Sequence, residues 1–236
     1  MIAKRVAAVR ERIARAAGRA GRQPEEITLV AVSKTFPPER VREAFAAGVR
    51  DFGENKVQEA EAKVPALADL HAQGLRWHLV GHLQANKARK AAALFEVIHS
   101  LDDGALGLRL EKAAAQLKKM LPVLVQVDLA GEETKFGLDE DHLFPALELL
   151  RGLKSVQVEG LMAIPPFTED PEDARPYFRR LRALRDKARG ENLLLGHALS
   201  MGMSHDLEVA IEEGATLVRV GTAIFGERAG AARVEP

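Results

Sequence analysis

Ile27-Thr28-Leu29-Val30-Ala31-Val32-Ser33-Lys34, an apolar and β-branched run followed by a lysine, begins the pattern that decides the fold of this chain. Similar runs recur along the sequence, separated by Ala-, Leu-, Glu- and Arg-rich stretches with helical periodicity. The runs start about 27 residues apart on average, which is the length of a strand, a helix and two short loops. They cover residues 27–32, 49–52, 77–80, 95–99, 123–129, 156–164, 197–199 and 216–220. Eight strands that alternate with helices in about 250 residues predict an α/β fold, a (β/α)8 or TIM barrel.

An open, doubly wound sheet is the rival fold, and the first turn after a strand argues against it. Residues 33–38 contain no glycine, whereas a dinucleotide-binding sheet has a Gly-rich turn at this point. Before the first strand, apolar residues recur at helical spacing at positions 2, 6, 9 and 13, which predicts an extra N-terminal helix. No linker or shift in composition divides the chain, so residues 1–236 are predicted to form a single barrel domain.

The composition excludes several classes of chemistry. The 236 residues include no cysteine, which rules out disulfides, thiolate catalysis and iron–sulfur clusters. Lys and Arg together number 34, as do Asp and Glu, so the chain lacks the net positive charge of a non-specific nucleic-acid-binding protein. No uncharged apolar run reaches the ~18–20 residues of a membrane span, and the basic first 22 residues lack the serines of a transit peptide. We therefore expect a cytoplasmic protein with no nucleic-acid or membrane partner.

Lys34 follows the first predicted strand, at the end of the barrel where active sites are built. Partial burial there would favour the neutral amine, which is the form that makes a Schiff base. A solvated loop lysine is the alternative reading of the same position.

Two small-residue turns late in the sequence favour a phosphate site. Residues 200–204 (SMGMS) follow the seventh strand, and residues 221–223 (GTA) follow the eighth. In (β/α)8 barrels the loops after these two strands often bind phosphate through backbone N–H groups, although ordinary tight turns have the same composition. Ser204 is predicted to cap the following helix, with Asp206 adding negative charge to its first turn.

Arg219 interrupts the apolar eighth strand two residues before its end. A guanidinium stays charged in proteins, so a buried arginine needs acceptors such as a carboxylate or a ligand nitrogen. A structural ion pair and a ligand contact therefore both remain open. Strand alternation places Arg219 and Gly221 on the same side.

Other polar residues follow the remaining strands. Asn55 follows the second strand, and it either caps a helix or points into the barrel mouth. His78 and His82 are four residues apart, but they lie on a strand and its loop with no third ligand nearby, so we predict no metal site. Thr134 and Lys135 contact an anion or belong to the loop surface, and Met162 at the end of the sixth strand is an apolar wall or part of the core.

Five segments occur in order over most of the chain: Ala31–Thr35, Gly53–Asn55, Trp77–Lys87, Ser200–Ser204 and Val218–Gly226. Together they resemble the pyridoxal phosphate homeostasis proteins, the small YggS/PROSC-type relatives of the alanine racemase N-terminal domain. The resemblance implies a (β/α)8 barrel that holds pyridoxal 5′-phosphate (PLP) as a Schiff base on Lys34. The further site residues that it implies are Ser200, Gly221 and Thr222 on the phosphate, Arg219 facing the pyridine nitrogen, and Asn55, His78 and Met162 lining the site. Two residues depart from the family pattern, Lys56 where an aromatic is frequent and His82 where a proline is common.

The residues favour a PLP-binding role in cofactor homeostasis over efficient catalysis. PLP is a strong electron sink chiefly when its ring nitrogen is protonated, and an arginine, which only donates, favours the unprotonated nitrogen. Racemisation also needs acid–base groups on both faces of the substrate carbon, and Lys34 serves one. In alanine racemases a tyrosine from a second domain serves the other. The sequence ends where that domain would begin, and its single tyrosine, Tyr177, falls on a predicted outer helix.

Two enzymatic alternatives stay open at this point. One is a slow PLP-dependent amino-acid racemase that uses one base or a histidine such as His78. The other is a Schiff-base aldolase acting on a phosphosugar, which would share Lys34 and the phosphate site. For the favoured role we expect a monomer that buffers PLP and delivers it to apo forms of PLP-dependent enzymes.

Overall fold

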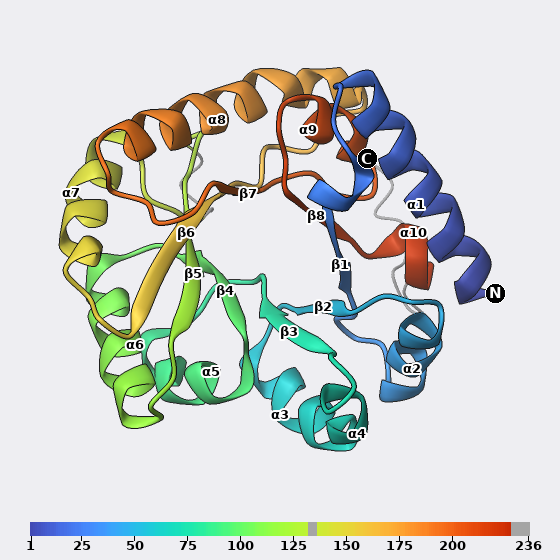
Figure 1. Ribbon diagram of the computed structural model, residues 1–236, viewed down its shortest axis with the longest axis horizontal. Helices are drawn as coiled ribbons and strands as arrows, with labels where there is room; N and C mark the ends of the chain where they lie inside the picture. The colour runs from blue at the N-terminus through green and yellow to red at the C-terminus, as the bar shows by residue number, and fades with distance from the viewer. Residues whose placement is uncertain (132–135, 228–236) are drawn as a thin grey trace.

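The structure, a computed structural model, describes residues 1–131 and 136–227, and in this part of the chain eight parallel strands close into a barrel (Figure 1). Each strand pairs with its neighbours in sequence, and β8 pairs with β1 to close the barrel. The strands are β1 (Thr28–Val32), β2 (Asp51–Glu54), β3 (Arg76–Leu79), β4 (Val97–Leu101), β5 (Leu121–Gln126), β6 (Val156–Met162), β7 (Ala198–Ser200) and β8 (Leu217–Val220). All eight runs predicted as strands contribute one, and the predicted (β/α)8 barrel is confirmed.

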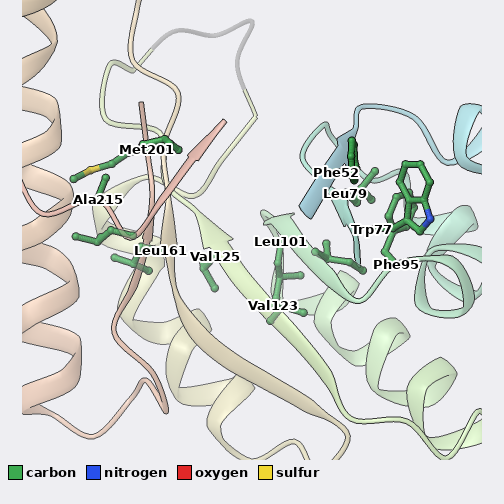
Figure 2. Close-up of a cluster of buried hydrophobic side chains, with 14 of the residues drawn as sticks. Phe52, Trp77, Leu79, Phe95, Leu101, Val123, Val125, Leu161, Met201 and Ala215 are labelled. Atoms are coloured by element: carbon green, nitrogen blue, oxygen red, sulfur yellow. The ribbon is translucent and has the colours of Figure 1, made fainter. Parts of the chain in front are cut away.

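Helices surround the barrel and cover the outward side of its strands (Figure 1). They are α1 (Ile2–Arg19), α2 (Pro38–Ala46), α3 (Val57–Ala66), α4 (Ala68–His71), α5 (Ala88–Leu94), α6 (Gly104–Gln116), α7 (Glu140–Arg151), α8 (Arg175–Gly190), α9 (Leu207–Glu212) and α10 (Thr222–Phe225), with short 3₁₀ turns at Pro24–Glu26, Ala85–Lys87 and Pro171–Ala174. The space between the strands and helices holds the main apolar core, of which Figure 2 shows a part. Phe52, Trp77, Leu79 and Phe95 gather there, with the Phe52 and Trp77 ring centroids 6.1 Å apart.

The predicted N-terminal helix is α1, and it packs on the outside of the barrel beside α9 and α10 (Figure 1). Its apolar positions 2, 6, 9 and 13 are all buried. Basic residues on the same helix reach acids of α9, since Arg12 Nε lies 2.6 Å from Glu208 Oε1 and Arg19 Nε lies 2.7 Å from Glu212 Oε1. The basic N-terminal segment is therefore a structural helix packed against the barrel.

Two local predictions about chain breaks are also confirmed. Pro65 lies in the last turn of α3, and the helix is interrupted at Leu67 before α4 begins. The proline-rich stretch after β6 forms a long connection, with Phe167 78% exposed. Within the described residues, no helix is both long enough and apolar enough to cross a membrane.

Apolar strand residues that face the barrel interior form a second apolar cluster, smaller than the main core. Alternation along the strands turns Phe52 and Leu79 toward the helices, and Val30, Val32 and Val80 toward the barrel axis, where these valines form their own cluster. A Cβ added to Gly53 would lie 3.2–3.3 Å from all three valines, so this interior is closely packed. The polar residues predicted for the site sit at the C-terminal end of this interior or project into it.

Candidate functional site

Lys34 lies two residues beyond the end of β1, on the C-terminal rim of the barrel. Its side chain is half-buried, at the end of the strand whose Val30 and Val32 face the barrel interior. The turn that carries it is fixed at Thr35, whose φ of 67° is left-handed and whose N–H donates to Glu59 Oε2 at 2.8 Å. The strand and this anchored turn therefore hold the lysine at the barrel mouth.

The loop after β8 lies directly beside Lys34. Ala31 of β1 is in register with Val220 of β8, and a Cβ on Gly221 would lie 3.4 Å from the Val32 carbonyl oxygen. Thr222 is the first residue of α10, so its N–H has no acceptor within the helix, and none lies elsewhere in the described residues. Lys34, Gly221 and Thr222 therefore lie on the same rim of the barrel.

Ser204 does not cap the helix after β7, and that prediction is wrong. The helix α9 begins at Leu207, and Asp206 occupies the N-cap position. The chain first turns at Gly202, whose φ is 90°, and this displaces the helix start toward the C-terminus. The Ser204 hydroxyl instead accepts a hydrogen bond from the Ala223 N–H at 3.3 Å, which joins the loops after β7 and β8. Sequence reasoning assigned Ser204 to a local cap and missed this position beside the predicted phosphate site.

Arg219 is buried in the barrel interior, 4% exposed. It donates from Nη1 to Ser200 Oγ at 2.5 Å and from Nη2 to the Ala163 carbonyl oxygen at 2.8 Å. Burial lowers the pKa of Arg219 to about 10, an effect that the negative charge of Asp206 opposes. Among the described residues no carboxylate lies within 4 Å of its guanidinium, so the structural ion pair that the sequence left open does not form there.

Ser200 and Met162 lie side by side at the ends of β7 and β6, in register with each other, and both are completely buried. The Ser200 hydroxyl contacts Arg219 on one side and His99 Nδ1, at 2.8 Å, on the other. Its side chain is therefore engaged on both sides in the interior of the barrel.

His78 and His82 belong to two different parts of the molecule. His78 is buried, with Nε2 2.9 Å from Asp51 Oδ1 and Nδ1 2.9 Å from His99 Nε2. His82 lies at the mouth, where Nδ1 is 2.8 Å from Asp102 Oδ2 and the ring stacks on Phe136 at 3.6 Å between centroids. Burial raises the pKa of Asp102, although the hydrogen bond from His82 opposes the rise. The spacing of four residues does not bring the two imidazoles to one ion.

Of the two positions considered for Asn55, a helix cap or the barrel mouth, the structure shows the barrel mouth. Lys56 occupies the N-cap position of α3, and Asn55 lines a cavity of about 260 Å³ at the C-terminal end of the barrel. The other lining residues are Val80, Gly81, His82, Gln126, Val127, Asp128, Phe136 and Ile164. Thr134 and Lys135 lie outside the described residues.

His99 is a buried polar residue that sequence reasoning missed. It ends the fourth apolar run and is completely buried, with both ring nitrogens hydrogen-bonded. A histidine inside an apolar strand is the one signal that pointed to it.

Comparison with known proteins gives a consistent result. The chain matches the family described as alanine racemase, N-terminal domain, over residues 5–229. It is 49% identical to the pyridoxal phosphate homeostasis protein of Aquifex aeolicus over 226 residues, which cover 95% of this chain and 97% of that protein. It is 41% identical to the Escherichia coli K12 protein of the same name over 232 residues, or 96% and 97% of the two chains.

Solved structures extend the comparison. PipY of Synechococcus elongatus, solved with PLP bound, has a TM-score of 0.85 and 41% identity, with 96% of this chain and 100% of that chain covered. Alanine racemase of Corynebacterium glutamicum has a TM-score of 0.70 and 18% identity, with 98% and 63% covered, and it shares the fold.

Proposed function

This chain belongs to the family of pyridoxal phosphate homeostasis proteins, which have the alanine racemase N-terminal domain, and from that membership we propose that it binds PLP at the C-terminal rim of its barrel. The observation that carries the proposal is its similarity, over nearly its whole length, to a structure that contains PLP. Lys34 would hold the cofactor covalently. The residues proposed to surround it are Asn55, His78, Met162, Ser200, Arg219, Gly221 and Thr222.

The donors around Lys34 suit the functional groups of PLP. When bound, PLP supplies an aldehyde that condenses with a primary amine, with loss of water, and a pyridine ring that withdraws electrons. Lys34 offers the amine, and the Thr222 N–H is available to a phosphate oxygen. Arg219 has five N–H donors, of which Ser200 and Ala163 take two, so donors remain for an unprotonated pyridine nitrogen.

The proposed role is to hold and release PLP, with weak racemase activity or none. A second acid–base group would have to face the substrate carbon from the side opposite Lys34. Tyr177 lies in the first turn of α8, on the outside of the barrel, and both ring nitrogens of His78 are already hydrogen-bonded. These positions support a binding protein over a two-base racemase. A cytoplasmic location and a monomeric state remain predictions from the sequence.

Covalent attachment is tested by borohydride reduction followed by peptide mapping. We expect purified protein to turn yellow with PLP, and reduction to label Lys34. The Lys34→Ala variant should lose the label while keeping some non-covalent PLP. Lys87→Ala is the matched control, because Lys87 lines a neighbouring hollow of about 390 Å³ together with Asn55. Protein that stays colourless with added PLP would defeat the proposal.

Delivery is tested by mixing the loaded protein with an apo PLP-dependent enzyme and following recovery of that enzyme's activity. Free PLP at the same total concentration is the comparison. A racemisation or α-proton exchange assay on the same preparations covers the enzymatic alternative. Robust turnover by the wild type that disappears in Lys34→Ala would replace the homeostasis role with a catalytic one.

A further inference from the structure

A continuous line of buried polar side chains crosses the barrel interior. Asp51, His78, His99, Ser200 and Arg219, here called the buried polar chain, come from β2, β3, β4, β7 and β8. Each member is hydrogen-bonded to the next, at 2.9, 2.9, 2.8 and 2.5 Å in that order. Every member is less than 9% exposed.

The chain meets solvent at the end opposite the proposed cofactor site. Asp51 lies at the N-terminal end of β2, where Arg76 binds both of its carboxylate oxygens at 2.8 and 2.9 Å. The Arg76 side chain is 57% exposed, and both residues line a hollow of about 660 Å³ on the N-terminal face. The buried polar chain therefore runs from the N-terminal face of the barrel to Ser200 and Arg219, near the C-terminal ends of β7 and β8.

The chemistry of its two ends fixes the direction of the outermost hydrogen bonds in the chain. Burial raises the pKa of Asp51, but hydrogen bonds and charge from His78 and Arg76 outweigh burial and hold the pKa below its usual value. An ionised carboxylate only accepts hydrogen bonds, and a guanidinium only donates them. Arg219 must therefore donate to Ser200, and His78 must donate to Asp51 through Nε2–H.

Between these ends, the Ser200 hydroxyl lies within hydrogen-bond distance of two side chains. Its oxygen accepts from Arg219 Nη1 at 2.5 Å, and the same hydroxyl pairs with His99 Nδ1 at 2.8 Å. His99 Nε2 in turn pairs with His78 Nδ1 at 2.9 Å. Burial, followed by the charges of His78 and Arg219, lowers the pKa of His99 well below its usual value, so the His99 ring is neutral and donates to one of its two partners.

We infer that the buried polar chain positions Arg219 for the ring nitrogen of the bound cofactor, and that Ser200 is a positioning residue rather than a phosphate ligand. The inference rests on the proposed PLP site and refines it. The completely buried Ser200 hydroxyl is engaged by Arg219 on one side and His99 on the other. The guanidinium is held through Ser200 and Ala163 and keeps donors for an acceptor nitrogen.

The first test measures the hydrogen bonds of the chain in the cofactor-free protein. The ring ¹⁵N chemical shifts of His99 report its protonation and its contacts, and we expect a neutral ring from pH 6 to 8 whose Nδ1 shift changes in Ser200→Ala. The charged groups that face the chain are Asp51, Arg76, Arg219 and Asp206. A doubly protonated His99 ring, or an Nδ1 shift that Ser200→Ala leaves unchanged, would overturn the inference, whatever the outcome with PLP.

The second test compares PLP with pyridoxal, which lacks the phosphate. Ser200→Ala should weaken both ligands alike, by about tenfold, because a hydrogen bond to a charged group is lost in each case. Ser200→Thr retains the hydroxyl and should remain within about threefold of the wild type. If Ser200→Ala weakens PLP and leaves pyridoxal unchanged, Ser200 binds phosphate and the inference fails. Failure of the wild type to bind PLP defeats the proposed function instead.

Discussion

The buried ion pair of Glu54 and Lys63, behind the Lys34 turn, gives a stability prediction whose size follows from the structure. Glu54 is completely buried, and Lys63 Nζ lies 2.7 Å from its Oε1 and 2.7 Å from the Ser33 carbonyl oxygen. The Ser33 hydroxyl donates to the same Oε1 at 2.6 Å, and Oε2 has no partner among the described residues. Burial raises the pKa of Glu54, and Lys63 and Ser33 oppose that rise.

Lys63→Met keeps most of the apolar stem and removes the charge. The remaining carboxylate either stays ionised, at a cost of about 3–5 kcal/mol for an unpaired buried charge, or takes up a proton. Protonation costs about 1.4 kcal/mol for each pH unit above the ordinary pKa of 4.5. That is about 4 kcal/mol at pH 7.5 and under about 1 kcal/mol at pH 5. Because the folded-state pKa is raised in the variant, its stability relative to the wild type falls as the pH rises.

Urea denaturation at pH 5 and pH 7.5 measures both values, with the fluorescence of Trp77, the single tryptophan, as the probe. We expect a loss of about 3–4 kcal/mol at pH 7.5 and about 1–2 kcal/mol at pH 5. Adding Glu54→Gln to Lys63→Met should restore most of the loss. The control is Lys90→Met, which breaks a surface pair with Glu61 and should cost less than about 1 kcal/mol. A loss for Lys63→Met that is the same at both pH values would refute the reasoning.

Three further predictions concern other parts of the barrel. Because the folded protein keeps His99 neutral while the unfolded chain binds a proton near pH 6.5, the wild type should lose about 1.4 kcal/mol from pH 7.5 to 5.5 through this residue. His99→Gln should remove that part of the pH dependence, and exposed His142→Gln should retain it. Glu213→Gln should cost about 1–3 kcal/mol by urea denaturation, because this buried acid pairs with three arginines of α8. Gly160→Ala should abolish folding or cost over ~3 kcal/mol, since its Cβ would lie 1.9 Å from a carbonyl oxygen of β7. Gly190→Ala, where nothing lies within 4 Å of the added Cβ, should be neutral or stabilising in the same assay.

The number and order of the strands could be predicted because each strand is an apolar run that the chain repeats at regular spacing. The boundaries were less predictable where burial depends on a distant partner. The second strand was predicted at residues 49–52 and lies at Asp51–Glu54. It extends to Glu54 because Lys63, on the following helix, compensates the buried carboxylate. Nothing in the local sequence distinguishes such a carboxylate from one in a loop.

The site was predictable where it depends on strand position, and less so where it depends on contacts between strands. Strand position placed Lys34 and Gly221 at the C-terminal rim, where the end of β1 lies beside the end of β8. His99 meets its partner Ser200 across 101 residues of sequence, and no periodicity reports such a contact. Ser204 fits the local rule for a helix cap, but a tertiary contact with the loop after β8 takes its hydroxyl.

The buried polar chain also bears on what the barrel can do chemically. A general base needs a lone pair that faces the substrate, and the two nitrogens of His78 face Asp51 and His99. Freeing either nitrogen for a substrate would break a hydrogen bond of the buried polar chain that holds Arg219. Using this histidine as a base would therefore disturb the support of Arg219, on which the orientation of the cofactor depends in the proposed site. The interior hydrogen bonds stabilise one fixed arrangement, which suits the proposed reversible binding of PLP better than repeated proton transfer on both faces of a substrate.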